Sequence, residues 1–442
     1  MAPPREPEPL SVAKKLVSHV VEASRLDFFT SRAIESIKRE NIRECIVIAF
    51  GKGSMSMVRG LLDSGVRPQG GVIVVPRGLP KESGNGLEVI EASHPIPDES
   101  SVRAGEAVIE WARASRGSCS IFLVSGGGSS LVEKPVDPID LEELIETTRL
   151  LIKSGASIIE INAVRKHLSM VKGGRLAEEA YPSRLIGLYA SDVPGDRIDS
   201  IASGPTVPDP TTYSDALSIL DLYGLRGKVP EKVVKVLSEG ARGLRPETPK
   251  PGSRIFSNAV NKVIAGNIDV LKRLKALLES WGYNTLLLTS RLEGESRHVG
   301  QALASITLES LERGYPVEPP AAILAGGETT VTVRGRGKGG RNMELALAWG
   351  ISMSAWHVSS EAAILAMDTD GIDGFTEYAG AVVEPAMIKH ARLKGVDPLR
   401  ELLDNNSLYV LESVGGLVKT GPTGSNLNSV VVIVLRGWSR RK

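Results

Sequence analysis

The sequence predicts an α/β fold divided into two domains. Short β-branched runs alternate with longer helical patterns along the 442 residues, as in parallel sheets whose strands are joined by crossover helices. Most strand-like runs are apolar for several residues in succession, which is typical of strands buried on both faces. The length suggests two or three domains, and the Pro-, Gly- and charge-rich stretch 243–254 predicts a linker between two of them.

The first domain is predicted over residues 1–243. It begins with a helical pattern at 10–40, and predicted strands follow at 45–50, 71–75, 87–91, 120–125 and 185–190. Helical patterns at 100–114 and 141–154 lie between these strands. This alternation favours a mostly parallel sheet.

The second domain is predicted over residues 255–442. A helical pattern at 259–281 opens it, and a long helix is expected to start at Asn342. Predicted strands lie at 284–289, 321–324, 329–334, 362–367 and 430–435. No fixed-period internal repeat is visible in the sequence.

Composition excludes several classes of protein. The 53 Lys and Arg residues balance 52 Asp and Glu, so no nucleic-acid or acidic membrane partner is indicated. No run approaches the ~18 apolar residues of a membrane span, and the Pro-rich start at 1–10 is unlike a signal peptide. Cys45 and Cys119 each open an apolar run, which predicts buried cysteines without a disulfide, a reducing compartment and a cytoplasmic location.

Glycine-rich loops follow two predicted strands of the first domain, where ligands of open parallel sheets bind. In Gly51-Lys52-Gly53-Ser54 the glycines let an anion approach the backbone and Lys52 adds a charge; the alternative is a tight turn with a solvated lysine. The run Ser125-Gly126-Gly127-Gly128-Ser129-Ser130 presents backbone donors that suit phosphate oxygens. Neither loop matches a dinucleotide fingerprint or a Walker loop.

Charged side chains mark two further places in the first domain. On a helix, Asn162, Arg165 and Lys166 share one face, which predicts a basic binding face or, alternatively, a solvated one. His167 is interpreted as a packing or surface residue. Asp192 follows a predicted strand, where a carboxylate can hold Mg²⁺ or accept a proton from a hydroxyl; the alternative is a turn-capping Asp.

The second domain has the same kind of loops. The run 326–328 (GGE) follows one strand, 335–340 (GRGKGG) leads into Arg341 at a helix start, 368–374 (DTDGIDG) follows another strand, and 420–426 (TGPTGSN) precedes the last. Glycines with Lys, Arg and Asp in both domains favour phosphoryl transfer, which needs positioning and charge neutralisation more than covalent chemistry. The sequence contains no Gly-x-Ser-x-Gly elbow and no usable zinc-ligand spacing.

Together these motifs resemble the glycerate 2-kinase family, whose C-terminal half is the MOFRL domain and some of whose members are labelled hydroxypyruvate reductases. Ten matching stretches run in family order over about 47–434. They are GKGS (51–54), HPIPDE (94–99), SGGGSS (125–130), NAVRKHLSMVKGGRLA (162–177), SDVPGD (191–196), IASGPT (201–206), AGGETTV (325–331), GRNMELALA (340–348), DTDGIDG (368–374) and TGPTGSNLN (420–428).

The resemblance implies ATP-dependent phosphorylation of D-glycerate on its 2-hydroxyl, with Mg²⁺ or another divalent cation. It implies a Rossmann-like N-terminal domain, a C-terminal MOFRL-type α/β domain with a mixed sheet, and an active-site cleft between them. Lys52 and Arg341 match the basic residues regarded as central in the family. A homodimer is an assembly that the sequence leaves open.

We therefore expect Lys52 and Arg341 to be catalytic, with Asp192 as general base or Mg²⁺ ligand and Asp368 and Asp370 as further metal candidates. The residues expected to bind ATP or substrate are Lys52, Ser125, Gly126, Gly127, Gly128, Ser129, Ser130, Asn162, Arg165, Lys166, Gly326, Gly327, Glu328 and Asn342. Which loops face ATP and which face glycerate is not determined by the sequence.

Three positions depart from the family pattern. Members commonly have Gln at Met343, Asp at Ser429 and Gly at Ser93, so a hydrogen-bonding group beside Arg341 and a carboxylate are missing here. One alternative is an NAD(P)-dependent hydroxypyruvate reductase, but the GKG loop lacks a third glycine and no acidic residue ends the strand at 71–75. The other is a non-catalytic phospho-sugar-binding regulator, which would bind ligand without releasing ADP.

Overall fold

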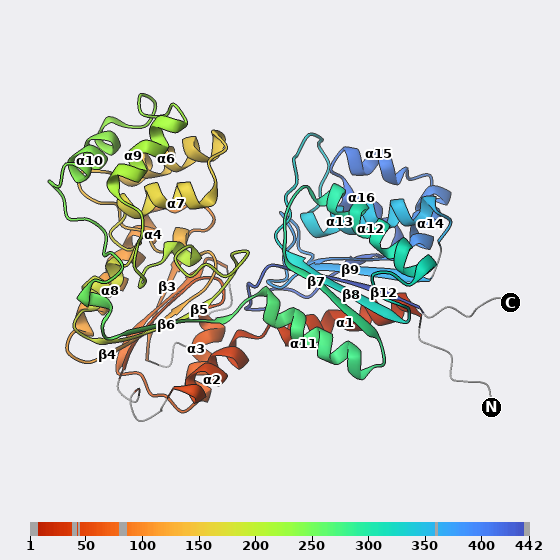
Figure 1. Ribbon diagram of the computed structural model, residues 1–442, viewed down its shortest axis with the longest axis horizontal. Helices are drawn as coiled ribbons and strands as arrows, with labels where there is room; N and C mark the ends of the chain where they lie inside the picture. The colour runs from red at the N-terminus through yellow and green to blue at the C-terminus, as the bar shows by residue number, and fades with distance from the viewer. Residues whose placement is uncertain (1–7, 38–41, 43–44, 79–85, 359–360, 437–442) are drawn as a thin grey trace. The chain divides into compact units, whose positions relative to one another are not determined.

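The computed structural model describes residues 8–37, 42, 45–78, 86–358 and 361–436 (Figure 1). These residues form two compact units. One unit is Leu26–Ala265, and the other combines the residues before Leu26 with those from Gly266 onward. The predicted linker at 243–254 therefore lies within the first unit, because the strand that follows it pairs with the first sheet.

The N-terminal unit contains a six-stranded, fully parallel sheet. Its strands are β1 (Cys45–Phe50), β2 (Gly70–Pro76), β3 (Glu88–Ala92), β4 (Cys119–Val124), β5 (Arg184–Ala190) and β6 (Ala259–Ala265). Their order, β3-β2-β1-β4-β5-β6, is that of a doubly wound Rossmann sheet. Every residue of β1 and β4 is buried, which explains their uninterrupted apolar sequences.

Helices cover both faces of this sheet (Figure 1). α2 (Leu26–Ser36) and α3 (Ser54–Asp63) pack together on one face, while α4 (Glu99–Ala114) and α8 (Arg175–Ala180) pack on the other. A separate helical cluster with its own apolar core contains α6 (Leu141–Lys153), α7 (Ile158–His167), α9 (Tyr213–Leu222) and α10 (Glu231–Ala241). The five strands predicted for this half and its predicted helices at 100–114 and 141–154 are thus confirmed.

The C-terminal unit contains a six-stranded mixed sheet. Its strands are β7 (Asn284–Leu292), β8 (Ala321–Gly327), β9 (Ala362–Asp368), β10 (Gly380–Val383), β11 (Leu417–Val418) and β12 (Ser429–Leu435). In the order β11-β10-β9-β12-β8-β7, only β7 and β8 pair in parallel. The mixed sheet implied by the resemblance is confirmed.

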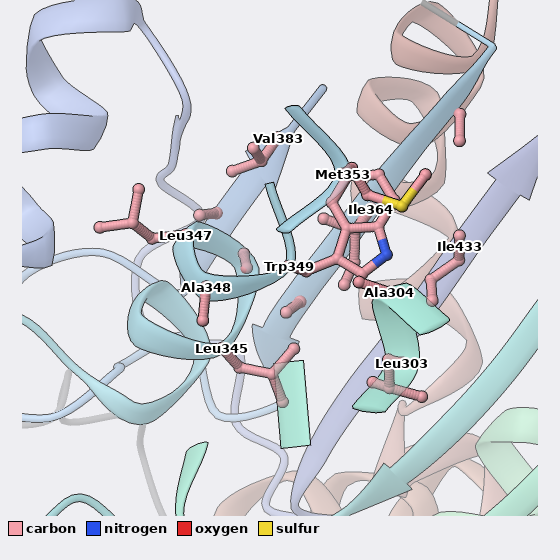
Figure 2. Packing of buried hydrophobic residues seen from close by; sticks show 14 of the residues in the cluster. Leu303, Ala304, Leu345, Leu347, Ala348, Trp349, Met353, Ile364, Val383 and Ile433 are labelled. Atoms are coloured by element: carbon pink, nitrogen blue, oxygen red, sulfur yellow. The ribbon is translucent and has the colours of Figure 1, made fainter. Parts of the chain in front are cut away.

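One face of the mixed sheet is covered by α1 (Pro9–Ala23) and α11 (Asn267–Ser280) (Figure 1). The other face packs against α12 (Ser296–Arg313), α13 (Arg341–Ala355), α14 (Pro385–Leu393), α15 (Pro398–Leu403) and α16 (Ser407–Val414). Trp349 of α13 fills this core (Figure 2), and its indole N–H donates to Thr307 Oγ1 at 3.1 Å. Trp349 thereby anchors the middle of α13 in this core.

Three predicted elements differ from the structure. The pattern at 10–40 is two helices, α1 and α2, in different units, and its end at 38–40 lies outside the described residues. The pattern at 259–281 is β6 followed by α11, because 259–265 pairs with β5. The stretch 329–334 is not a strand. Thr330 makes only an isolated bridge to Glu295, and the backbone N–H groups of Thr332 and Arg334 donate to the side chains of Glu295 and Asn405.

The prediction of unpaired cysteines is wrong, because Cys45 and Cys119 form a disulfide. They open the adjacent strands β1 and β4 and are register partners, with Cα atoms 4.5 Å apart. The sequence showed that each opens a strand but not that the two strands are neighbours. The cytoplasmic location rested partly on unpaired cysteines and stays a prediction.

Candidate active site

The loops after β1 and β4 are bonded to each other at the point where the order of the parallel sheet reverses. A doubly wound sheet leaves a ligand-binding crevice at this point. Lys52 N donates to Gly126 O at 2.9 Å, and Gly53 N donates to Ser125 Oγ at 2.9 Å. A Cβ on Gly51 would lie 2.3 Å from Ser125 Oγ, so the contact between the loops requires glycine there. Strand order thus joins two loops that are distant in sequence.

Gly127 lies at the centre of this pair of loops. Its φ of +80° is in the left-handed region, and a Cβ there would lie 3.0 Å from His94 Cδ2 and 3.3 Å from Lys52 Cγ. The structure therefore brings Lys52 against the glycine run. It also adds His94, which sequence reasoning assigned no role although it begins the HPIPDE motif after β3.

The rest of the glycine run turns into α5 (Gly128–Leu131), a helix of only four residues. Gly128 N donates to Ser125 O at 3.3 Å, and Ser130 Oγ donates to Gly127 O at 3.1 Å. A Cβ on Gly128 would lie 2.9 Å from the side chains of Phe50 and Ala202. The run is therefore a closely packed turn in which Gly127 and Gly128 are required by packing.

Two of the three predicted residues of α7, Asn162 and Arg165, are hydrogen-bonded to the glycine-run turn at Ser129, directly or through Ser203. Ser129 Oγ bonds Ser203 Oγ at 2.8 Å, and Ser203 Oγ donates to Asn162 Oδ1 at 3.0 Å. Arg165 Nη2 donates to Ser129 O at 3.1 Å. Lys166 instead lies buried near Asp209, 3.4 Å from Oδ1, so the structure separates it from the loop.

Other charged groups of this region are also internal. Lys172 is buried and lies 2.7 Å from Glu133 Oε2; burial lowers the pKa of Lys172 to about 8, against the attraction of Glu133. His167 is buried, and its Nε2 lies 2.9 Å from Glu247 Oε1, which confirms it as a packing residue. Asp192 is half-buried in the loop after β5, the strand next to β4.

In the C-terminal unit, Arg341 lies across three neighbouring strand ends. Its Nη1 lies 2.7 Å from Glu328 Oε1, just after β8, and its Nη2 lies 2.8 Å from Asp368 Oδ2, at the end of β9. Its Nε donates to Ser429 Oγ at 3.2 Å, at the start of β12. Ser429 pairs in register with both Gly327 and Asp368, so the antiparallel middle strand brings all three partners to one edge.

The start of α13 fixes Arg341 through an acidic cap. Asp373 accepts hydrogen bonds from the backbone N–H groups of Asn342 (3.1 Å) and Met343 (2.9 Å). Asn342 Nδ2 also lies 3.3 Å from Asp368 Oδ2. Sequence reasoning missed Asp373, although a carboxylate that caps a helix start is a familiar signal.

Burial and ion pairing oppose each other in this cluster. Burial raises the pKa of Asp368, against the pull of Arg341. Burial likewise raises the pKa of Asp373 to about 6, against its backbone hydrogen bonds. Burial acts against the charge of Arg341, but Asp368 and Glu328 raise its pKa above the usual value. Acidic groups of perturbed pKa around a fixed guanidinium are typical of functional sites.

The remaining predicted residues lie at the same edge of the mixed sheet. Asp370 Oδ1 accepts from Ile372 N at 2.9 Å, and Asp370 O accepts from Thr423 N at 3.2 Å, which ties 368–374 to 420–428. A Cβ on Gly326 would lie 2.1 Å from Asn267 Oδ1. The side chain of Met343 is fully buried in the core, so this departure from the family pattern removes no group from the Arg341 cluster.

Within 8–37, 42, 45–78, 86–358 and 361–436, no three His, Cys, Asp or Glu side chains are grouped so that they could hold a metal ion. Across the same part of the chain, every helix is too short or too polar to span a bilayer.

Fold and site define an α/β protein with a Rossmann-order sheet, a mixed-sheet unit, and a glycine loop pair and a fixed arginine at strand ends. The family profile described as "Domain of unknown function (DUF4147)" matches residues 11–238, and that described as "MOFRL family" matches 321–429. A glycerate 2-kinase of Pyrococcus horikoshii is 45% identical over 88% of this chain and 87% of its own length. A D-glycerate 2-kinase of Thermotoga maritima is 39% identical over 97% and 99%. The chain belongs to the glycerate kinase family that combines these two regions.

Solved structures and other relatives agree with this membership. A crystal structure of a Pyrococcus horikoshii protein has a TM-score of 0.82 at 39% identity, covering 98% of this chain and all of that one. A crystal structure of glycerate kinase from Thermotoga maritima has a TM-score of 0.84 at 37% identity, covering 96% and 100%. A protein of Agrobacterium vitis, named a putative hydroxypyruvate reductase, is 38% identical over 88% of this chain and 87% of its own length.

Proposed function

We propose that the protein is an ATP-dependent glycerate 2-kinase, which transfers the γ-phosphoryl group of ATP to the 2-hydroxyl of D-glycerate. Relatives of that name at 39% and 45% identity over most of the chain support the activity. The structural observation that carries the proposal is the pair of glycine loops, one bearing Lys52, at the switch point of the parallel sheet. Phosphoryl transfer needs such a positioned, positively charged surface.

In this proposal the run 125–130 holds the phosphates of ATP, and Lys52 neutralises charge on the transferring group. The contact of Gly127 with His94 and Lys52 supports a common location for these groups. Asn162 and Arg165 act by holding Ser129, directly or through Ser203, so they are positioning residues. Lys166, which is paired with Asp209, has no direct part.

Arg341 is proposed to bind an oxyanion of substrate or of the transferring phosphoryl group. Its three partners fix the guanidinium plane, and a guanidinium has more N–H donors than these partners use. A fixed fork that retains donors suits a carboxylate or phosphate. Glu328 and Asn342 then orient Arg341 and its partner Asp368.

The family resemblance implies a divalent cation. The carboxylates near the proposed site are the groups that could bind it. Mg²⁺ in kinases is held by one or two carboxylates with phosphate oxygens and water, so a larger protein cage is not needed. Asp368 does not fit, because Arg341 and Asn342 already engage its carboxylate. We assign the cation to Asp192, which is half-buried after β5, the strand next to the one that leads into the glycine run; alternatively Asp192 acts as the general base. Asp370, in the loop after β9, is a second candidate. When bound, the cation would neutralise charge on the phosphates.

The deciding experiment is a coupled ADP-release assay with D-glycerate, ATP and MgCl₂. We expect ADP release that depends on D-glycerate, with 2-phosphoglycerate as the product. Formation of 3-phosphoglycerate would contradict the assigned hydroxyl. Oxidation of NADH by hydroxypyruvate without consumption of ATP would instead establish a reductase, and ligand binding without ADP release would establish a regulator.

A further inference from the structure

A pocket of about 370 Å³ lies at the end of the mixed sheet opposite Arg341. Its lining includes Ser11 and Lys15 of α1, Trp281 and Tyr283 after α11, Pro320 before β8 and Arg436 after β12. β12 begins at Ser429, which contacts Arg341, and ends beside Arg436. At about 3.3 Å per residue, that strand separates the pocket from Arg341 by roughly 20 Å. The pocket is therefore distinct from the candidate active site.

The lining chemistry of the pocket is cationic and aromatic. Lys15 and Arg436 are basic and no lining residue is acidic, although acidic and basic residues balance over the whole chain. No carboxylate of the described ranges lies within ion-pair distance of either cation. Lys15 Nζ lies 4.4 Å from the centroid of the Trp281 ring, which keeps its charge at the pocket wall. Cations without carboxylate partners that share a concave, aromatic-walled site favour an organic anion.

Three elements connect this pocket with the Arg341 cluster. The first residue of α11, Asn267, donates through Nδ2 to Leu427 O (2.8 Å) and Ser429 O (2.9 Å), and Trp281 caps the other end of that helix. The far end of α1 accepts a hydrogen bond at Ser24 O from Ser425 Oγ, at 2.8 Å. β12 itself joins the two places. These contacts are the route by which binding at the pocket would reach the segment that contacts Arg341.

We propose that this pocket binds a small organic anion and that binding changes the rate of the reaction at Arg341. The carboxylate or phosphate group lies between Lys15 and Arg436, and the carbon skeleton rests on the wall formed by Trp281 and Pro320. The proposed anion site is argued from the pocket's own residues and does not depend on the proposed kinase function. Only the proposed effect on the reaction rate rests on that function.

The test compares the K15E/R436E double variant with K272E, which reverses an exposed cation on α11 outside the pocket lining. Isothermal titration of the full chain uses 2-phosphoglycerate, AMP, citrate and inorganic phosphate as separate probes. We expect at least one probe to show a site whose affinity falls tenfold or more in K15E/R436E and is unchanged in K272E. The probes that bind distinguish a phosphate from a carboxylate ligand. Equal affinities in both variants for every probe would overturn the proposal.

Rate measurements then test the coupling. With the bound probe added to saturation, we expect kcat or KM of wild type and K272E to change at least twofold, and those of K15E/R436E to stay constant. A saturable pocket in an active kinase whose rate it leaves unchanged would overturn the regulatory part. Absence of kinase activity together with pocket binding would reject the proposed function and leave the anion site standing. Unchanged thermal midpoints in both variants serve as the folding control.

Discussion

At the scale of single residues, Arg341 both neutralises the carboxylates of Glu328 and Asp368 and is proposed to bind an oxyanion. Arg341→Lys keeps the positive charge but loses the planar fork that reaches Glu328, Asp368 and Ser429. We expect kcat to fall by about 10²- to 10³-fold with a nearly unchanged thermal midpoint. Arg341→Ala leaves Asp368 buried without its cation, so it should also destabilise the unit by about 3 kcal/mol. Arg336→Lys, on an exposed loop residue, is the control; equal activity of all three variants would remove Arg341 from the site.

Asp373 gives the same unit a dependence on pH. Burial raises its pKa from the usual 3.8 to about 6, so the folded unit holds a proton that the unfolded chain releases between pH 4 and 6. Its contribution to the free energy of unfolding is fully present below pH 4 and is lost as the pH rises through 6. We expect the thermal midpoint of wild type, relative to Asp373→Asn, to decline over this window. Parallel midpoint curves for the two proteins would contradict the buried proton.

The candidate site was predictable where a side chain follows a strand or starts a helix. Arg341, Glu328, Asp368 and Asn342 were predicted separately from such positions, and the structure brings them together. Lys166 shares a helical face with Arg165 in sequence terms, yet it is drawn to Asp209, because a buried ammonium requires a carboxylate partner. That partner lies 43 residues away, so no local pattern reveals it.

At the scale of elements, the start of α13 depends on Gly340. Its φ of −143° is open to any residue, but a Cβ would lie 2.2 Å from the Asp373 carboxyl carbon. Gly340→Ala should therefore displace the cap, lower the thermal midpoint by several degrees and reduce kcat at least tenfold, because Arg341 is the next residue. Gly227→Ala, where an added Cβ meets nothing within 4 Å, is the matched control. An unchanged kcat in Gly340→Ala would show that the cap does not position Arg341.

The disulfide joins the first residues of β1 and β4, the two strands whose opposite ends lead into the paired glycine loops. It closes a loop of 74 residues, which corresponds to roughly 4 kcal/mol of stabilisation through the unfolded chain. We expect Cys45→Ala/Cys119→Ala, or reduction of the wild type, to lower the thermal midpoint of the N-terminal unit without abolishing activity. Thiol titration of the unfolded, unreduced protein should find no free cysteine. Two titratable thiols would contradict the disulfide.

Apolar runs predicted the buried strands well, since β1, β4, β9 and β12 are covered on both faces and need no alternation. The same rule failed for β6, whose sequence AVNKVIA is exposed or half-buried apart from its last residue. Helical periodicity and strand alternation are ambiguous over so short a segment. Its strand identity comes from pairing with β5, which is tertiary information.

At the scale of the whole molecule, the sequence predicted two α/β domains but not which segments compose them. Helix α1 belongs to the unit formed by the second half of the chain, because its apolar face packs on β9 and β12. The adjacency of β1 and β4 is likewise a property of topology, and both the loop pair and the disulfide follow from it. Amphipathic patterns specify that a face is buried without naming the surface that buries it.

The two units supply Lys52 and Arg341 separately, so a kinetic double-mutant cycle can establish whether one reaction uses both. If Lys52 and Arg341 stabilise the same transferring phosphoryl group, each of Lys52→Met and Arg341→Lys should reduce kcat by about 10²-fold or more. The double variant should then lose less than the product of the single effects, since residues acting as a unit are not additive. Multiplicative losses would mean that the two residues act on independent steps. A wild-type kcat in Lys52→Met would remove the N-terminal loop pair from the chemistry and leave the reaction to the C-terminal cluster alone.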